Sequence, residues 1–303
     1  MVCKCSRFKQ YERIIIELNI MKIAVAGSDG FVGKEVCRQL EACGHDIFRI
    51  DITQGLDLSD PSVINLIPVV DCFIHLANLV YVPASYENPA LYYRVNYMTT
   101  LNALEVCRRD KARLVYISSY VYGPPQYLPV DENHPMNPFN PYAQTKVICE
   151  KLCEGYHRDF GVKVSVIRPF NLYGVGQKGK LLIPEIIGQL KEGKTEIQLK
   201  AASPKRDYIN VVDVARAICM CAESNEEYET YNVCSGQSVS VREITEIINK
   251  YLRNKVTFNF SVSDRPNEVD ESRGSYEKLR ALGWKPTILF EEGLRAIVES
   301  ENL

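Results

Sequence analysis

The stretch Lys22-Ile-Ala-Val-Ala-Gly27-Ser-Asp-Gly30-Phe31-Val32-Gly33 decides the fold. Its first five residues have the length and apolar character of a buried strand, and a helical pattern begins at Phe31. Glycine suits the turn between them because the chain bends tightly there and its backbone must approach a ligand closely. A pyrophosphate on such a turn binds the N–H groups at the start of the helix. We therefore predict a dinucleotide site made of Gly27, Gly30, Phe31, Val32 and Gly33.

An acidic residue follows the glycine turn at the expected distance. Asp51 ends a second predicted strand, 46–51, about 20 residues further on. A carboxylate there accepts hydrogen bonds from ribose hydroxyls and repels a 2′-phosphate, which favours NAD, while the nearby Arg49 leaves NADP open. Asp57 and Leu58 are expected beside the adenine; the alternative is a helix N-cap near Asp57 or Asp60.

Strand-length apolar runs alternate with helical stretches over the first half of the chain. Further strands are expected at 71–76, 113–118 and 163–168, and helices at 31–43, 61–67, 89–109 and 141–159. This alternation predicts an α/β fold, a Rossmann-type doubly wound parallel sheet with a smaller C-terminal α/β substrate lobe. We expect an N-terminal extension (1–20), a dinucleotide-binding domain (21–172) and a mainly substrate-binding lobe (173–303). The last lobe is expected to contain helices at 183–191, 211–223 and 241–252. Some of its segments should return to the first domain.

Composition excludes several classes of partner. The net charge is −2 without a basic stripe, so we expect no nucleic acid, and no apolar run approaches the roughly 20 residues of a membrane span. The eleven cysteines are scattered without C-x-x-C spacing or neighbouring histidines. They predict neither a metal site nor a disulfide framework, and they fit the reducing cytosol.

A second constellation lies in the middle of the chain. Tyr142 and Lys146 are four residues apart, which puts both on one face of a helix. A lysine ammonium beside a phenol favours the phenolate, and a tyrosine needs such help to act as a base near neutral pH. The fourth predicted strand ends in Ser118-Ser119, at the edge of the sheet where ligands of open α/β sheets bind.

The sequence resembles the extended short-chain dehydrogenases/reductases, in their nucleotide-sugar epimerase/dehydratase branch. The resemblance covers nearly all of residues 21–300. It rests on these segments in the order of the family: Gly27–Gly33, His75-Leu-Ala-Asn78, Tyr116–Gly123, Pro141–Lys146, Arg168–Gly174, Arg206–Asp213 and Tyr231-Asn-Val.

The resemblance implies a role for each matching residue. Counted back from Tyr122-Gly123, the catalytic serine falls on Ser118 rather than on Ser119; Tyr142 is the general base and acid, and Lys146 holds the nicotinamide ribose. The remaining residues contact the cofactor or the substrate: Leu76 and Ala77 line the cofactor, Pro169 touches the nicotinamide, Asn171, Arg206 and Arg265 bind the substrate diphosphate, and Glu268 binds the nucleotide ribose.

Two departures from the family pattern narrow the function. The 4,6-dehydratases place Asp-Glu after their catalytic threonine, where this chain has Ser119 and Tyr120, so water elimination is disfavoured. Asn78 stands where small residues are usual in the family, so the resemblance does not predict the wall of the cleft on the substrate side.

The resemblance implies an NAD-dependent epimerase acting at C4 of a nucleotide-diphosphate hexose through a transient 4-keto sugar. The alternative is an NAD(P)H-dependent reductase of nucleotide-diphosphate 4-keto-6-deoxysugars. A non-catalytic NAD-sensing protein is a third hypothesis, against which Ser118, Tyr142 and Lys146 argue. Many relatives form homodimers through their two long helices, which here correspond to 89–109 and 141–159.

Overall fold

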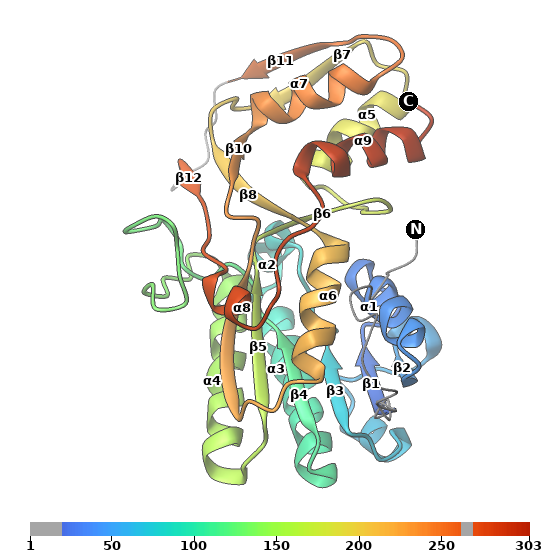
Figure 1. The fold of residues 1–303 in the computed structure, drawn as a ribbon, viewed down its shortest axis with the longest axis vertical. Helices are drawn as coiled ribbons and strands as arrows, with labels where there is room; N and C mark the ends of the chain where they lie inside the picture. Colours follow the sequence, from blue (N-terminus) through green and yellow to red (C-terminus); the bar gives the residue numbers. More distant parts are fainter. Residues whose placement is uncertain (1–19, 262–268) are drawn as a thin grey trace, which may run out of the picture.

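A six-stranded parallel sheet forms the centre of the larger lobe in the computed structural model, which describes residues 20–261 and 269–303 (Figure 1). The strand order is β2-β1-β3-β4-β5-β9, and every neighbouring pair is parallel. The strands are β1 (Lys22–Ala26), β2 (Asp46–Ile50), β3 (Cys72–His75), β4 (Arg113–Ile117), β5 (Val164–Pro169) and β9 (Tyr228–Val233).

Helices cover both faces of this sheet because alternate strand residues point to opposite sides. In β1, Ile23 and Val25 pack toward α1 (Phe31–Ala42) and α6 (Val211–Ala222), whereas Ala24 and Ala26 belong to the core on the other face. That face is covered by α3 (Pro89–Asp110) and α4 (Pro141–Phe160). All these strand residues are fully buried, as expected for a parallel sheet between two helical layers.

The two long helices begin with the same local signal. Asn88 and Asn140 each precede a proline, and each side chain accepts a hydrogen bond from a backbone N–H three residues further on, at 3.2 and 2.8 Å. The side chain thereby caps the first turn, where proline has no N–H to leave unpaired. These caps place Tyr142 in the first turn of α4.

The direction in which the chain winds reverses between β1 and β3. The chain moves outward from β1 to β2 and then crosses back to β3, so that the carboxyl ends of β1 and β3 diverge into different loops. Ligands of doubly wound sheets bind at such a switch point. Gly27 follows β1 with a φ of +81°, and a Cβ on it would lie 2.9 Å from the backbone nitrogen of Ala77, just after β3.

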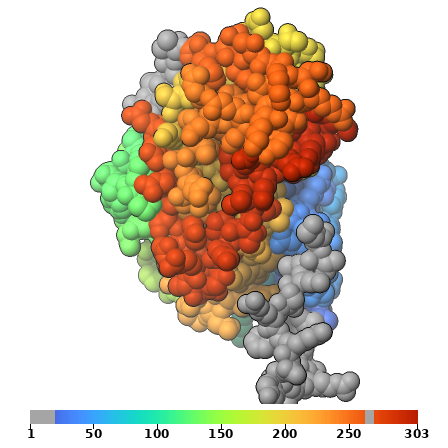
Figure 2. Space-filling model, turned by 45° about the horizontal axis from the view of Figure 1, so that its top comes forward, coloured from blue at the N-terminus to red at the C-terminus, as the bar shows by residue number. Residues whose placement is uncertain are grey.

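The smaller lobe is built mainly from the C-terminal half of the chain. Its core lies among α5 (Leu182–Lys191), α7 (Val241–Tyr251), α9 (Phe290–Ser300) and the pair β7 (Glu196–Lys200) with β11 (Thr257–Ser261). Figure 2 shows these yellow, orange and red segments over one face of the molecule, with the blue N-terminal segments at one side. The remaining elements are α2 (Val82–Glu87), α8 (Glu277–Ala281), β6 (Asn171–Tyr173), β8 (Lys205–Asn210), β10 (Ser238–Ser240) and β12 (Glu271–Ser272).

The predicted fold class is confirmed, and the elements named from the sequence lie within about two residues of their observed bounds. One expected helix, 61–67, is instead a 3₁₀ helix over Pro61–Leu66, capped by Asp60. The sequence analysis named no strand after residue 168, and it therefore missed β9, which completes the central sheet beside β5.

The fit of Gly33 against the turn gives a first prediction. A Cβ at Gly33 would lie 2.0 Å from the Gly27 carbonyl oxygen and 2.8 Å from the Ser28 Cα, and neither backbone atom can move cheaply. We expect Gly33→Ala to lower the unfolding free energy by about 2–3 kcal/mol, measured by urea denaturation. The matched control is Gly155→Ala in α4, where a Cβ meets nothing within 4 Å and should stabilise the helix. Equal stability of the two variants would contradict this account.

Candidate active site

One cleft of about 1470 Å³ runs along the carboxyl ends of the strands and between the two lobes. It brings together every predicted site residue that the structure describes: Gly27, Gly30, Phe31, Val32, Gly33, Asp51, Asp57, Leu58, Leu76, Ala77, Ser118, Tyr142, Lys146, Pro169, Asn171 and Arg206. Arg265 and Glu268 lie outside the described residues.

The glycine turn leaves the start of α1 open toward the cleft. Gly30 is the N-cap residue, no side chain caps the first turn, and that turn contains no acidic residue. The first N–H groups of a helix carry a partial positive charge and need an acceptor. Because Phe31 and Val32 line the cleft, this end of α1 fits a pyrophosphate of the kind that the glycine pattern predicts.

The Asp51 carboxylate is held in a fixed position beside this turn. Its Oδ2 accepts a hydrogen bond from the Asp29 backbone at 3.0 Å, and its Oδ1 accepts one from the Thr53 backbone, also at 3.0 Å. Arg49 does not line the cleft; its guanidinium pairs with Glu41 instead. Of these two charged groups, only the Asp51 carboxylate lines the cleft. Asp57 lines the cleft and accepts a hydrogen bond from the Ser59 backbone at 2.8 Å, whereas the N-cap of the 3₁₀ helix is Asp60.

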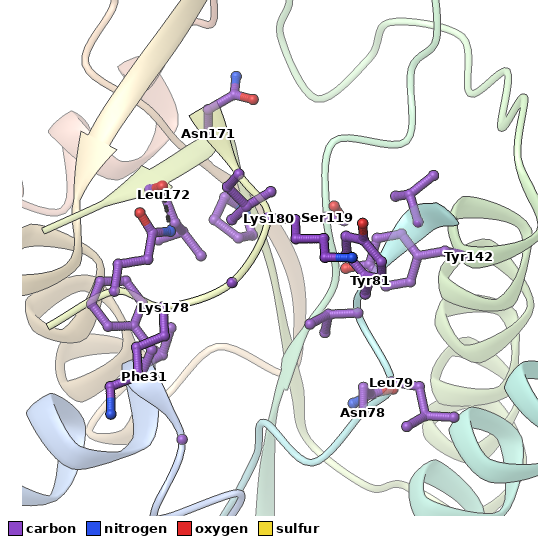
Figure 3. Close-up of a pocket in the computed structure, with 18 of the residues that line it drawn as sticks. Phe31, Asn78, Leu79, Tyr81, Ser119, Tyr142, Asn171, Leu172, Lys178 and Lys180 are labelled. Atoms are coloured by element: carbon purple, nitrogen blue, oxygen red, sulfur yellow. Dashed lines mark hydrogen bonds between the residues drawn. The ribbon is translucent and has the colours of Figure 1, made fainter. Parts of the chain in front are cut away.

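Tyr142 and Lys146 lie one turn apart on α4, at the other end of the cleft. Figure 3 shows Tyr142 there. The Lys146 Nζ donates a hydrogen bond to the Ile117 carbonyl oxygen at 2.7 Å and lies 5.9 Å from the centre of the Tyr142 ring. Burial raises the pKa of Tyr142 to about 12 and lowers the pKa of Lys146 to about 8. Without a substrate, burial therefore opposes the charged form of both groups.

The two serines after β4 have different neighbours on α4. The Ser118 hydroxyl donates to Glu150 at 2.5 Å, and Glu150 pairs with Arg168 in the buried layer behind the cleft. The Ser119 side chain lies beside Tyr142 and lowers the pKa of Tyr142 against the larger effect of burial. Figure 3 shows Ser119 beside Tyr142.

Because β4 ends at Ile117, whose carbonyl oxygen holds Lys146, Ser118 and Ser119 are the first two residues beyond the strand. Both serines line the cleft. The choice of Ser118 that the resemblance implies therefore stays a prediction, with Ser119 as a neighbouring hydroxyl beside Tyr142.

Asn171 and Arg206 line the part of the cleft that faces the smaller lobe. Asn171 lies on β6 and donates through Nδ2 to the Asp207 carbonyl oxygen at 3.0 Å, which fixes its side chain. The Arg206 guanidinium donates to the carbonyl oxygens of Lys205 and Val269. Its charge also opposes the effect of burial, which raises the pKa of Tyr120 to about 12. An amide and a guanidinium at one end of a cleft suit a phosphate group.

Several cleft residues were not assigned from the sequence. Asn78 lines the cleft after β3, and its Oδ1 is buried without a partner among the described residues. Two lysines, Lys178 and Lys180, enter from the loop that follows β6. No spacing rule connects that loop with a site, and its place above the cleft depends on the packing of the two lobes.

Other kinds of site find no support in the part of the chain that the structure describes. Within residues 20–261 and 269–303, no three His, Cys, Asp or Glu side chains lie together as a metal site would require. Over the same residues, no helix combines the length and apolar character needed to cross a membrane.

Comparison with known proteins agrees with this geometry. Residues 23–234 match the model of the NAD dependent epimerase/dehydratase family. A protein named "Putative UDP-glucose 4-epimerase" from Methanocaldococcus jannaschii is 32% identical over 301 residues, covering 91% of this chain and 97% of its own. The GDP-6-deoxy-D-mannose reductase of Pseudomonas aeruginosa is 34% identical over 294 residues, covering 91% and 96%.

A solved structure shows the same fold over almost the whole chain. The structure of RMD from Pseudomonas aeruginosa, complexed with NADPH, superposes with a TM-score of 0.85 at 33% identity and covers 93% of this chain and 98% of its own. The glycine turn, the cleft and these comparisons lead to one conclusion: the chain belongs to the NAD-dependent epimerase/dehydratase family.

Proposed function

We propose that the protein oxidises and re-reduces C4 of a nucleotide-diphosphate hexose and so acts as an NAD-dependent epimerase. One observation carries the proposal: Ser119, Tyr142 and Lys146 meet in the same cleft as the open N-terminus of α1. A hydroxyl placed at Tyr142 is then within the same enclosed space as a dinucleotide on the glycine turn. The relatedness to "Putative UDP-glucose 4-epimerase" supports this substrate class.

Each catalytic side chain has a distinct role in the proposal. Bound NAD would supply the hydride acceptor and donor. Tyr142 takes the proton from the sugar hydroxyl and returns it, and Ser119 donates a hydrogen bond that stabilises the phenolate. Lys146, fixed by the Ile117 carbonyl oxygen, presents its positive charge to the Tyr142 ring and to the nicotinamide ribose. Because burial raises the pKa of Tyr142, both contacts are needed near neutral pH.

The cofactor and the substrate have separate anchors. Asp51 selects NAD over NADP because a 2′-phosphate would meet a carboxylate, while Arg49 is already paired with Glu41. Asn171 and Arg206 hold the substrate diphosphate at the side of the cleft that faces the smaller lobe. With the diphosphate held, a 4-keto sugar can turn so that the opposite face receives the hydride. The resemblance adds Arg265 and Glu268 as further contacts to the nucleotide.

A nucleotide-diphosphate 4-keto-6-deoxysugar reductase is the second candidate. It is favoured by the relatedness to the GDP-6-deoxy-D-mannose reductase of Pseudomonas aeruginosa and by the likeness to the NADPH complex. The same three side chains would then catalyse only the reduction of the 4-keto group, with Tyr142 donating a proton to the carbonyl oxygen.

The nucleotide released from the purified protein separates the two candidates. An epimerase recycles its cofactor in place, so we expect one NAD⁺ per chain on denaturation and interconversion of UDP-glucose and UDP-galactose without net change in absorbance at 340 nm. A protein that is purified empty and consumes NADH or NADPH stoichiometrically with a 4-keto nucleotide sugar would be the reductase. Failure to bind any dinucleotide would refute both.

Substitution of Ser118 and of Ser119 by alanine tests which of the two hydroxyls takes part in catalysis. Ser119→Ala should lower kcat by about a hundredfold, because one preorganised hydrogen bond to the reacting centre is lost, and it should leave thermal stability nearly unchanged. Ser118→Ala should keep most of kcat but lower the unfolding free energy by about 1–3 kcal/mol, since the buried Glu150 loses a hydrogen bond. The reverse pattern would support Ser118 instead.

We further propose a homodimer through α3 and α4. These helices pack against each other, and both leave an apolar side chain exposed, Tyr97 (39%) on α3 and Ile148 (42%) on α4. Light scattering should give twice the chain mass of 34.5 kDa, and Ile148→Asp should shift it toward the monomer. A monomeric wild-type protein at micromolar concentration would contradict this proposal.

We also place the protein in the cytoplasm and in carbohydrate biosynthesis. The nine cysteines of the described residues are free thiols, most of them buried, as expected for a reducing compartment. Cell fractionation tests the location.

A further inference from the structure

The loop between β6 and α5, residues 174–181, lies over the start of α1. A Cβ on Gly174, with φ +157°, would lie 3.3 Å from the Phe31 ring, so the loop begins in contact with the first residue of that helix. Gln177 ties the loop back through a hydrogen bond from Nε2 to the Leu172 carbonyl oxygen at 2.9 Å. The next residues, Lys178 to Lys180, therefore lie at the edge of the dinucleotide end of the cleft.

The two lysines of this loop are charged groups without an anionic partner among the described residues. Both line the cleft and are exposed. By contrast, Lys191 and Lys194, which follow closely in the chain, are paired with Glu301 and Glu192 at 2.6 and 2.8 Å. The loop thus presents two available ammonium groups to the space in which two diphosphates are expected.

The side chains of the two lysines diverge. Figure 3 shows Lys178 beside Phe31, at the start of α1, whereas Lys180 extends across the cleft toward Ser119 and Tyr142. Gly179, between them, has a φ of +106° and no neighbour within 4 Å of its Cβ position. This left-handed conformation, which side-chain-bearing residues rarely adopt, separates the two lysines.

The negative charge at the dinucleotide end of the cleft favours a cation there. The side chains that line it include the carboxylates Asp51 and Asp57, and Asp29 lies beside Asp51. A pyrophosphate adds two negative charges, against which the end of α1 offers about half a positive charge. The positive charges of Lys34 and Arg49 help to lower the pKa of Asp29, and neither residue lines the cleft. Lys178 is the lysine placed to balance the pyrophosphate.

We propose that Lys178 binds the pyrophosphate of the dinucleotide and, together with the N–H groups at the start of α1, encloses it from two sides. The inference rests on the proposed dinucleotide site. It assigns Lys178 to the cofactor rather than to the sugar nucleotide, and Lys180, two residues further on, to the part of the cleft near Tyr142.

Isothermal titration of Lys178→Ala, Lys180→Ala and the wild type tests this assignment. The probes are NAD⁺, ADP-ribose, which keeps the pyrophosphate without nicotinamide, and UDP, with any retained nucleotide first removed. Lys178→Ala should weaken NAD⁺ and ADP-ribose by about tenfold, which corresponds to about 1.4 kcal/mol, and leave UDP unchanged. Its affinity for NAD⁺ should also depend less on salt than that of the wild type. Lys178→Arg should restore most of the affinity.

Lys180→Ala is the matched control, since it removes the same charge from the same loop and should leave NAD⁺ affinity within about twofold of the wild type. Equal losses in both variants, or a loss for UDP alone in Lys178→Ala, would overturn the inference. A wild type that binds neither NAD⁺ nor ADP-ribose would instead refute the proposed function, so the two failures are distinguishable.

Discussion

The contact between the turn after β1 and the loop after β3 is the constraint on which the rest of the site depends. At Gly27 the two backbones approach so closely that no side chain fits between them, and Gly33 brings α1 equally close to the same turn. This packing brings the end of α1 to the switch point of the sheet, where the strands diverge. Without it, the first N–H groups of α1 would not face the cleft, and a pyrophosphate would have no fixed position.

A second constraint acts at the opposite end of the cleft. The same burial that excludes water from Tyr142 and Lys146 makes the charged form of each less stable, so their pKa values move apart, to about 12 for Tyr142 and about 8 for Lys146. A phenolate beside an ammonium is favoured only when the two charges compensate for lost solvation. The hydrogen bond from Ser119 and the anchoring of Lys146 on β4 therefore decide whether the phenol can give up its proton.

The sequence was informative wherever a short-range rule applies. Strand length and glycine spacing located β1, the turn and α1, and the asparagine caps fix the two long helices that the periodicity predicts. It failed where the result depends on distant packing. β9 joins the sheet across a separation of more than 50 residues from its neighbour β5, and nothing local in its six residues specifies that pairing.

The loop over α1 connects the two constraints. An epimerase gains from holding its dinucleotide through every turnover, whereas a reductase must release it, so the two activities place opposite demands on whatever covers the pyrophosphate. In this chain the cover begins in contact with Phe31 and continues through glycines that have positive φ and no packing neighbours. The affinity that this loop adds for a dinucleotide therefore depends on charge more than on apolar contact. Charge–charge attraction across a partly solvated cleft is weakened by salt, whereas packed apolar surface is not. If Lys178 binds the pyrophosphate as proposed, the rate of cofactor release depends on that side chain, and a change there acts on the property in which an epimerase and a reductase differ.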